Sequence, residues 1–314
     1  MRPPPTLRGV LPALVTPFLA GDPGELDLVA LSRLAARALD RGVAGLVVCG
    51  STGEAPALAP AEHARTVACV AEASGGRPVV AGVGAPCTEA AVALAVAAEH
   101  LGATALLVSA PPYVKPGQTG LRAHVRAIAA ATGLPIVLYD VPSRAGIAFA
   151  DETIARLFED RQIQALKDAS GDLSRPPRLA RLCGPELIQL SGDDATALAH
   201  LAMGGQGCVS VTANVAPALC ATLQAAFTTR DLSFAATLRD LLAPLDAALF
   251  AETNPVPVKA ALGLMGLCAS GVRLPLTRSE PATMARLSRA LVAVTEQEEA
   301  TAAAFARPRF RQVA

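Results

Sequence analysis

Short apolar runs alternate along the chain with longer stretches rich in Ala, Leu and Arg, and this alternation constrains the fold more than any other feature. The runs recur about every 25 to 30 residues, as expected for repeated strand–helix units around a parallel sheet. Each run is apolar throughout, which is typical of a strand covered on both faces. Eight runs fit this description: LPALVTP (11–17), GLVVCG (45–50), PVVAGVG (78–84), ALLVSA (105–110), PIVLYDVP (135–142), IQALKDA (163–169), LIQLSGD (187–193) and CVSVTA (208–213).

Eight parallel strands with intervening helices predict an α/β fold of the (β/α)8 TIM barrel type. A chain of 314 residues with 52% hydrophobic residues can bury a core of that size. The sequence after residue 214 is helical in character. We therefore expect a barrel that carries the active site at 1–224, a C-terminal helical extension packed on it at 225–305, and a loose tail at 306–314.

The balance of charge argues against one large class of partner. The chain has 27 acidic and 27 basic residues, so it offers no basic surface to a phosphate backbone. Residues 195–229 contain no Asp, Glu, Lys or Arg, but MGGQG and VTANVAP interrupt them with turn residues and polar groups. We expect neither nucleic acid nor a membrane as a partner.

The N-terminus, the cysteines and the histidines bear on location and on metals. The segment MRPPPTLRGV lacks the apolar run of a signal peptide. The seven cysteines are odd in number and form no C-x-x-C pair, which fits a reduced cytoplasm. The four histidines are not spaced as a helical metal site. We expect a cytoplasmic protein without a bound metal.

Reactive groups of a TIM barrel gather at the C-terminal ends of its strands, and there Lys167 stands out. The chain has 24 Arg but only three Lys. A lysine at the inner end of a strand is desolvated, which favours the neutral amine that attacks a ketone to give a Schiff base. Arginine stays protonated and cannot do this. The alternative is a lysine that reaches solvent or pairs with Asp168.

Phenols and hydroxyls stand at the same end of the predicted barrel. The chain has no Trp and only two Tyr, Tyr113 and Tyr139, and both follow predicted strands. Because Leu, Val and Ala fill the core, we expect the two tyrosines to serve as proton donors and acceptors through their hydroxyls. The alternative is that they only fill space in the core. Ser51 and Thr52 add hydroxyls in the turn GSTGE, whose N–H groups could hold a carboxylate or simply form a Gly-shaped turn.

Several motifs occur in the order and spacing of a known superfamily. They are GSTGE (50–54), PPYVKPGQTGL (111–121), YDVPSRAG (139–146), LKDASGD (166–172), LSGDD (190–194) and CVSVTANV (208–215), followed by NPVPVKAAL and RLPLT. With them, nearly the whole chain resembles the dihydrodipicolinate synthase and N-acetylneuraminate lyase superfamily, and the arginine of VPSRAG favours the synthases. The resemblance implies condensation of pyruvate with L-aspartate 4-semialdehyde to 4-hydroxy-tetrahydrodipicolinate in lysine biosynthesis, without a cofactor.

The resemblance also implies catalytic roles for individual residues. Lys167 would form the Schiff base with pyruvate, and Tyr139 would relay protons above it. Ser51 or Thr52 and Tyr113 would complete a proton relay to solvent. Tyr113 would reach in from a neighbouring subunit, so the resemblance implies a homo-oligomer, a dimer of dimers.

Other residues would bind the two substrates. Thr52 and the backbone near Val209 would hold the pyruvate carboxylate. Arg144 would receive the carboxylate of the semialdehyde, because a guanidinium fits a carboxylate bidentately. Gly192 would leave room for substrate.

Two residues depart from the pattern of the synthases. Ser51 stands where the synthases usually carry Thr and the lyases commonly carry Ser, and Asp140 stands where Asn is usual. Two alternatives remain open. One is another pyruvate-dependent aldolase, acting on N-acetylneuraminate, a 2-keto-3-deoxy sugar acid or 4-hydroxy-2-oxoglutarate, and the other is a keto-acid-binding paralogue without turnover. Asp193 and Asp194 are interpreted as scaffold residues that form hydrogen bonds.

Many synthases of the family are inhibited by lysine through a polar pocket at a subunit interface. At the corresponding positions this chain has Ala55, Pro86, Ala90 and Pro112, and only His63 remains of the polar set. Each missing contact to a charged ligand costs about 1 to 3 kcal/mol. The sequence therefore predicts that lysine does not inhibit this protein.

Overall fold

A computed structural model describes residues 7–306, and its centre is a barrel of parallel strands. The strands pair in the order β1-β10-β9-β8-β7-β6-β5-β4, and a parallel bridge between Ala13 and Val47 joins the two ends of this series. The predicted (β/α)8 barrel is confirmed. Its strands are β1 (Gly9–Pro12), β4 (Leu46–Val48), β5 (Val79–Gly82), β6 (Ala105–Ser109), β7 (Ile136–Asp140), β8 (Ala165–Asp168), β9 (Ile188–Ser191) and β10 (Gly207–Ser210).

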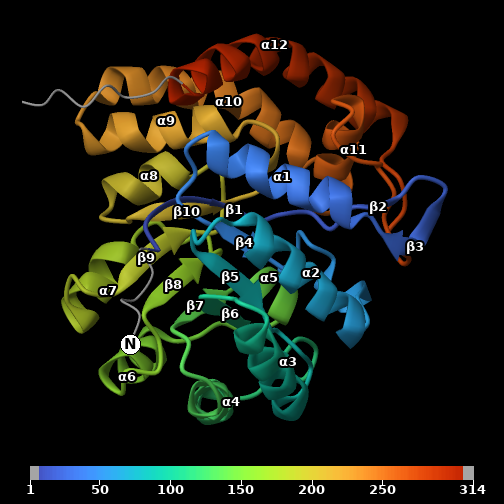
Figure 1. Cartoon of the computed structure of the whole chain (residues 1–314). Helices are drawn as coiled ribbons and strands as arrows, with labels where there is room; N and C mark the ends of the chain where they lie inside the picture. The colour runs from blue at the N-terminus through green and yellow to red at the C-terminus, as the bar shows by residue number, and fades with distance from the viewer. Residues whose placement is uncertain (1–6, 307–314) are drawn as a thin grey trace, which may run out of the picture.

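Helices connect the strands and cover the outside of the barrel (Figure 1). A short hairpin of β2 (Phe18–Leu19) and β3 (Asp22–Leu26) precedes the first helix. The last helices pack on one another as a layer on one side of the barrel, at the top of Figure 1. The helices are α1 (Leu28–Asp40), α2 (Pro60–Ala73), α3 (Thr88–His100), α4 (Gln118–Ala131), α5 (Pro142–Ala145), α6 (Asp151–Glu159), α7 (Arg175–Cys183), α8 (Ala197–Ala202), α9 (Pro217–Thr228), α10 (Leu232–Leu249), α11 (Val256–Leu264) and α12 (Pro281–Ala306).

Alternation along each strand decides which side chains point into the barrel. In β7, Val137 and Tyr139 belong to the interior cluster, whereas Leu138 packs in the outer core beneath the helices. In β8, Ala165 lies in the same interior cluster. Lys167 is two residues after Ala165, so it points to the same face of the sheet, and it pairs in register with Tyr139. The strand pattern therefore directs Tyr139 and Lys167 to the same side of the sheet.

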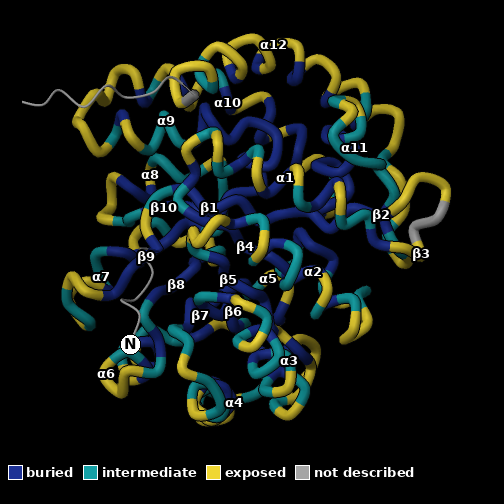
Figure 2. Tube along the Cα trace, viewed as in Figure 1, coloured by how far each residue is buried: buried dark blue, intermediate teal, exposed yellow. Residues whose placement is uncertain are grey.

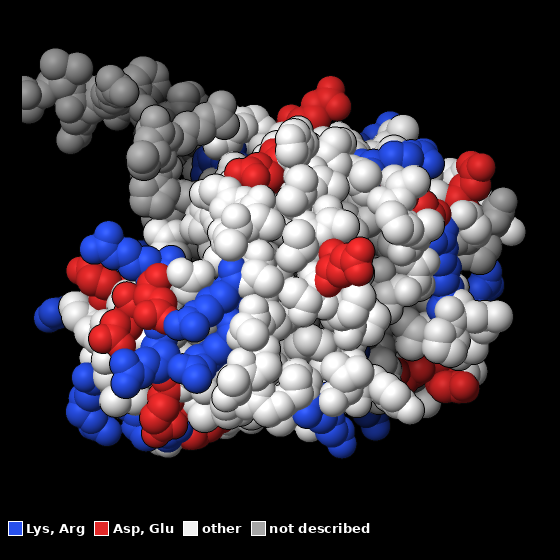
Figure 3. All heavy atoms as spheres, turned by 90° about the horizontal axis from the view of Figure 1, so that it is seen from below, with Lys and Arg blue, Asp and Glu red and all other residues white. Residues whose placement is uncertain are grey.

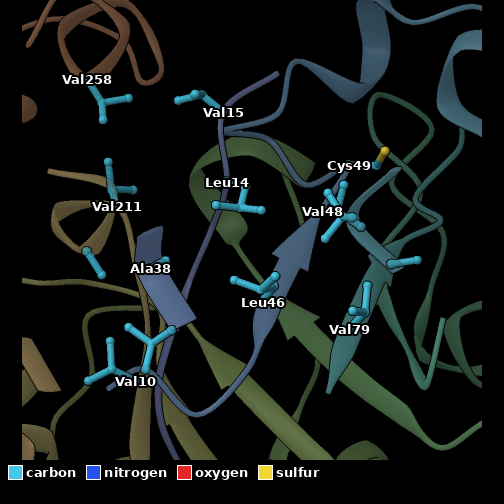
Figure 4. Close-up of a cluster of buried hydrophobic side chains, with 14 of the residues drawn as sticks. Val10, Leu14, Val15, Ala38, Leu46, Val48, Cys49, Val79, Val211 and Val258 are labelled. Atoms are coloured by element: carbon cyan, nitrogen blue, oxygen red, sulfur yellow. The ribbon is translucent and has the colours of Figure 1, made fainter. Parts of the chain in front are cut away.

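The larger hydrophobic core lies between the strands and the surrounding helices. Figure 2 shows buried chain at the strands and exposed chain on the outer turns. In Figure 4, Val10 of β1, Leu46 of β4 and Ala38 of α1 belong to one buried cluster. Val258 of α11 is part of the same cluster. The C-terminal helices therefore share the core of the barrel.

Two predictions about the chain's organisation stay predictions. The expected division between 224 and 225 falls within α9, which runs across that position. The expected tail at 306–314 lies, except for Ala306, outside the described residues. Within 7–306, no helix is both long enough and apolar enough to cross a membrane.

Charges of both signs are mixed on the surface. On the face shown in Figure 3, acidic and basic side chains lie next to one another, and a wide region between them carries few charges. At the surface, Arg156 pairs with Glu159, and Arg178 pairs with Asp172. This face therefore presents no continuous basic surface.

Candidate active site

The ends of β7 and β8 bring Lys167 and Tyr139 into contact inside the barrel. Lys167 is 5% exposed, and its Nζ lies 4.0 Å from the centroid of the Tyr139 ring. Within the described chain, Nζ makes no hydrogen bond and no ion pair. A buried amine without a carboxylate partner is free to act as a nucleophile once it loses its proton.

Asp168, the alternative partner of Lys167, lies on the other side of the sheet. Asp140 and Asp168 are paired in register, and both contact Arg175. Nη1 of Arg175 lies 2.6 Å from Oδ2 of Asp140 and 3.4 Å from Oδ1 of Asp168. Burial raises the pKa of Asp140, while the hydrogen bond and charge of Arg175 oppose that rise. The unusual Asp140 therefore belongs to a buried ion-pair cluster behind the site.

The turn 50–54 after β4 holds the two predicted hydroxyls. It packs so closely on β5 that a Cβ at Gly82 would lie 2.1 Å from the carbonyl oxygen of Cys49, so only glycine fits there. Ser51 is partly exposed and Thr52 is buried. The two adjacent hydroxyls therefore face different surroundings.

A cavity of about 360 Å³ lies beside this turn and the end of β7. Three of the predicted site residues line it, namely Ser51, Tyr139 and Arg144. The C-terminal region also lines the cavity, and our interpretation of the sequence assigned no role to these residues. Apart from Thr253, they lie in the motifs NPVPVKAAL and RLPLT, which is the signal the sequence gives for them. They are Thr253, Asn254, Pro255, Arg273, Leu274, Pro275 and Leu276.

Asn254 connects two of the predicted substrate-binding residues. Its Nδ2 donates a hydrogen bond to Oγ1 of Thr52 over 2.9 Å. Its backbone carbonyl accepts a hydrogen bond from Nη2 of Arg144 over 3.1 Å. Arg144 is itself exposed, in the short helix α5. The predicted pyruvate and semialdehyde contacts are thus joined through one residue.

The remaining predicted residues are not part of the cavity wall. Lys167, Thr52, Gly192 and Val209 do not line the cavity among the described residues. A Cβ at Gly192 would lie 2.9 Å from the Cβ of Ala169, so the packing of neighbouring strand ends itself requires glycine there. Val209 is buried within β10, in the interior cluster. Their contacts with substrate stay predictions.

Tyr113 does not meet Lys167 within one chain. Its side chain is 93% exposed, and its backbone has a φ of 73°, a conformation that L residues rarely adopt. The preceding Pro112 lines the cavity and the following Val114 is also exposed. The structure therefore places an exposed phenol next to the cavity mouth.

Lys259 of α11 is a second buried amine, for which the sequence indicates no role. It is 0% exposed, and its Nζ lies 2.7 Å from Oε1 of Glu54 and 2.9 Å from the carbonyl oxygen of Thr16. The same Nζ lies 4.0 Å from the centroid of the Phe18 ring. Burial lowers the pKa of Lys259, and the Glu54 carboxylate opposes that effect. Lys259 therefore anchors α11 to the turn that holds Thr52.

Asp193 and Asp194 form scaffold hydrogen bonds, as the sequence predicted. Oδ2 of Asp193 accepts from the backbone N–H and the hydroxyl of Thr196. Asp194 accepts from the hydroxyl of Ser210 and from the N–H of Val211. In the described part of the chain, no group of three or more His, Cys, Asp and Glu residues could hold a metal ion.

Comparison with known proteins agrees with this arrangement. The family model of the dihydrodipicolinate synthetase family matches residues 6–294. The chain is 48% identical to the 4-hydroxy-tetrahydrodipicolinate synthase of Rhodospirillum centenum over 286 residues, which is 91% of this chain and 97% of that protein.

Solved structures give the same result. The 4-hydroxy-tetrahydrodipicolinate synthase of Methylacidiphilum fumariolicum SolV has a TM-score of 0.90 and 36% identity, covering 96% of this chain and 99% of that one. The chloride-inhibited dihydrodipicolinate synthase of Acinetobacter baumannii, complexed with pyruvate, has a TM-score of 0.88 and 38% identity, covering 92% of this chain and 99% of that one. The match spans nearly all of the chain, its barrel and its C-terminal helices, and the chain therefore belongs to the dihydrodipicolinate synthetase family.

Proposed function

We propose that the protein condenses pyruvate with L-aspartate 4-semialdehyde to give 4-hydroxy-tetrahydrodipicolinate, the reaction that its relatives are named for. The observation that carries the proposal is the buried Lys167, whose amine contacts the Tyr139 ring and has no ion-pair partner in the described chain. The related Acinetobacter baumannii enzyme was solved with pyruvate, a ketone that such an amine attacks.

The proposed chemistry begins with an imine on Lys167. The amine adds to the pyruvate ketone and water leaves, and loss of a methyl proton then gives an enamine that attacks the aldehyde. Protons must move between positioned groups, because free water would protonate the enamine. Tyr139 is in contact with the amine, and Ser51 lines the same cavity. These two hydroxyls are the proposed first steps of the proton path, with Thr52 as a hydrogen-bond donor to the pyruvate carboxylate.

The second substrate brings a carboxylate that needs a fixed cation. Arg144 lines the cavity, and the carbonyl of Asn254 accepts one of its N–H groups. The other donors of a guanidinium suffice for a bidentate contact with a carboxylate. We assign Arg144 to the semialdehyde, with Gly192 and Val209 as further contacts of bound substrate.

Tyr113 leads us to propose a homo-oligomer, a dimer of dimers. An almost fully exposed phenol beside the cavity mouth can serve a neighbouring subunit better than its own, because a two-fold contact would bring it to the partner's site. Mixing Tyr113→Phe with Lys167→Ala subunits should restore activity in hybrids. No recovery after verified subunit exchange would contradict a shared site.

One experiment tests the reaction and its substrate together. Borohydride added with pyruvate should leave a reduced three-carbon adduct on the peptide that contains Lys167, and an adduct on Lys115 or Lys259 instead would overturn the proposal. A coupled assay at saturating pyruvate should then rank L-aspartate 4-semialdehyde above sugar-derived aldehydes and glyoxylate. A preference for one of those would assign the protein to another aldolase of the superfamily. Ser51, which the lyases commonly carry at this position, is the residue that favours this alternative.

We further propose a cytoplasmic protein that needs no metal or organic cofactor, since the lysine itself serves as the electron sink. The proposed organisation is a barrel at 1–224 with a helical region at 225–305. Because Asn254 and Arg273 line the cavity, we include the helical region in the proposed active site.

A further inference from the structure

Asn254 is an unusual residue in this chain. The sequence contains only two asparagines, Asn214 and Asn254, and both are buried. Asn254 is 7% exposed, and it lies just before the N-cap residue of α11, among the residues that line the cavity. A buried amide must be hydrogen-bonded to offset its desolvation, so its bonding pattern is informative.

We propose that Asn254 is a positioning residue that fixes the Thr52 hydroxyl for pyruvate through its side chain. Separately, its backbone carbonyl steadies the Arg144 guanidinium. The inference rests on the proposed function, because it takes Thr52 as the pyruvate contact and Arg144 as the semialdehyde contact. Different atoms of one residue serve the two substrates.

The direction of the hydrogen bond gives the side chain its role. Nδ2 of Asn254 is the donor and Oγ1 of Thr52 is the acceptor. The hydroxyl proton of Thr52 is therefore not used in this bond, and it can be donated to a carboxylate oxygen of the substrate. An acceptor at position 254 would instead take up that proton.

The other end of the amide supports a functional reading. Oδ1 of Asn254 is buried and has no hydrogen-bond partner within the described residues. An unpartnered buried acceptor destabilises the folded protein, so its presence calls for an explanation such as a functional role. Within residues 7–306, the bond to Thr52 is the one hydrogen bond that the side chain of Asn254 makes to offset this cost.

Two contacts hold the region of Asn254 and α11 against the turn that contains Thr52. Lys259, which follows Asn254 along the chain and lies in the first part of α11, binds Glu54 and the carbonyl of Thr16. The turn 50–54 is therefore held at two points, by Asn254 in the segment before α11 and by Lys259 within α11. A fixed backbone at Asn254 also fixes the carbonyl that Arg144 contacts.

The test separates the two substrates. Asn254→Ala removes Nδ2 but keeps the backbone carbonyl. The KM for pyruvate should rise, and the rate of imine formation should fall, by about 3- to 10-fold, the effect of one lost hydrogen bond. The KM for the semialdehyde should change by less than twofold. Asn254→Asp, similar in size but without the N–H donor, should share the pyruvate defect.

Matched controls exclude a general loss of stability. Asn214 binds the carbonyls of Ala13 and Val211 and accepts from the N–H of Val15, so Asn214→Ala should lower the melting temperature without separating the two KM values. In a Thr52→Val background, Asn254→Ala should add no further pyruvate defect.

The outcomes distinguish this inference from the proposed function. Wild-type protein that gives no borohydride adduct with pyruvate overturns both. If the wild type gives the adduct, the inference alone is overturned by an unchanged pyruvate KM in Asn254→Ala. It is also overturned by equal rises in both KM values, or by wild-type behaviour of Asn254→Asp.

Discussion

Two buried lysines of this chain have similar surroundings but different partners. Lys167 at the end of β8 and Lys259 in α11 each have Nζ 4.0 Å from the centroid of an aromatic ring, that of Tyr139 and that of Phe18. Lys259 also bonds to Glu54 and to a backbone carbonyl, whereas Lys167 has neither kind of partner in the described chain.

The comparison separates a lysine with a structural ion pair from the lysine that we propose to be catalytic. A buried ammonium that is paired with a carboxylate holds two elements together, and removing it leaves an uncompensated charge. A buried amine without such a partner adds nothing comparable to stability. It is kept where an amine can react. The predictions below test this division, beginning with the largest expected effect.

Replacement of Lys167 should remove activity without affecting the fold. Lys167→Arg should lower turnover by at least about 1000-fold and abolish the borohydride adduct, because an always protonated guanidinium is not a nucleophile. Steady-state rates, mass spectrometry and circular dichroism measure the three properties. Lys115→Arg is the control and should keep its turnover. Turnover near the wild-type rate in Lys167→Arg would contradict the assignment.

Replacement of Lys259 should have the opposite effect. Lys259→Met leaves the buried Glu54 without its cation, which should lower the free energy of unfolding by about 3 to 5 kcal/mol. The exposed Lys115→Met should change it by less than about 0.5 kcal/mol. Chemical denaturation measures both variants. A Lys259→Met protein as stable as the wild type would show that this pair is not structural.

Arg144 should separate the two substrates. Losing a charge-assisted bidentate contact costs about 2 to 4 kcal/mol, so Arg144→Ala should lower kcat/KM for the semialdehyde by about 30- to 1000-fold. Imine formation with pyruvate should be unaffected. Arg156→Ala, a surface arginine paired with Glu159, is the control. Loss of the pyruvate imine in Arg144→Ala would show that the guanidinium acts on pyruvate and would contradict its assignment to the semialdehyde.

Asp246 of α10 is the acidic counterpart of an unpaired buried lysine. Burial raises its pKa from 3.8 to about 7, and it has no ion pair in the described chain. Between about pH 4 and pH 7 the folded protein binds more protons than the unfolded protein, so this group lowers stability as the pH rises and has its full destabilising effect above pH 7.

Asp246→Asn should therefore stabilise the protein at pH 8 by about 1 to 3 kcal/mol and flatten the pH dependence between pH 4 and pH 7. Asn keeps an acceptor for the Thr212 hydroxyl. Unfolding free energies at pH 5 and pH 8 measure the effect. Asp240→Asn, on the surface of the same helix, is the control. If Asp246→Asn were destabilised equally at both pH values, the claim that the charged Asp246 lowers stability at high pH would be wrong.

The smallest expected effect is that of lysine itself. Ala55 and Pro112 line the cavity without polar groups, and Nε2 of the buried His63 is hydrogen-bonded to the carbonyl of Gly82. The last polar residue of the expected effector pocket is thus already engaged. A dose-response curve with L-lysine at fixed pyruvate should stay flat, and half-inhibition below about 1 mM would contradict the prediction.

Much of the site could be predicted because strands have a period of two residues. Once PIVLYDVP and IQALKDA are read as neighbouring strands of a barrel, their C-terminal ends must lie side by side. Tyr139 and Lys167 stand at those ends and are therefore expected to be neighbours. The rarity of lysine and tyrosine in this chain pointed to the same residues. Sequence alone therefore determined the barrel and the contact between Tyr139 and Lys167.

Contacts between distant segments were decided only by the tertiary structure. Nothing near Asn254 in the sequence indicates a bond to Thr52, 202 positions away, and nothing near Asp140 indicates that Arg175 neutralises it behind the sheet. The sequence pattern indicates to which face of the sheet a side chain points, because successive residues of a strand point to opposite faces. Which group meets it there depends on how separate elements pack, and only the folded chain specifies that.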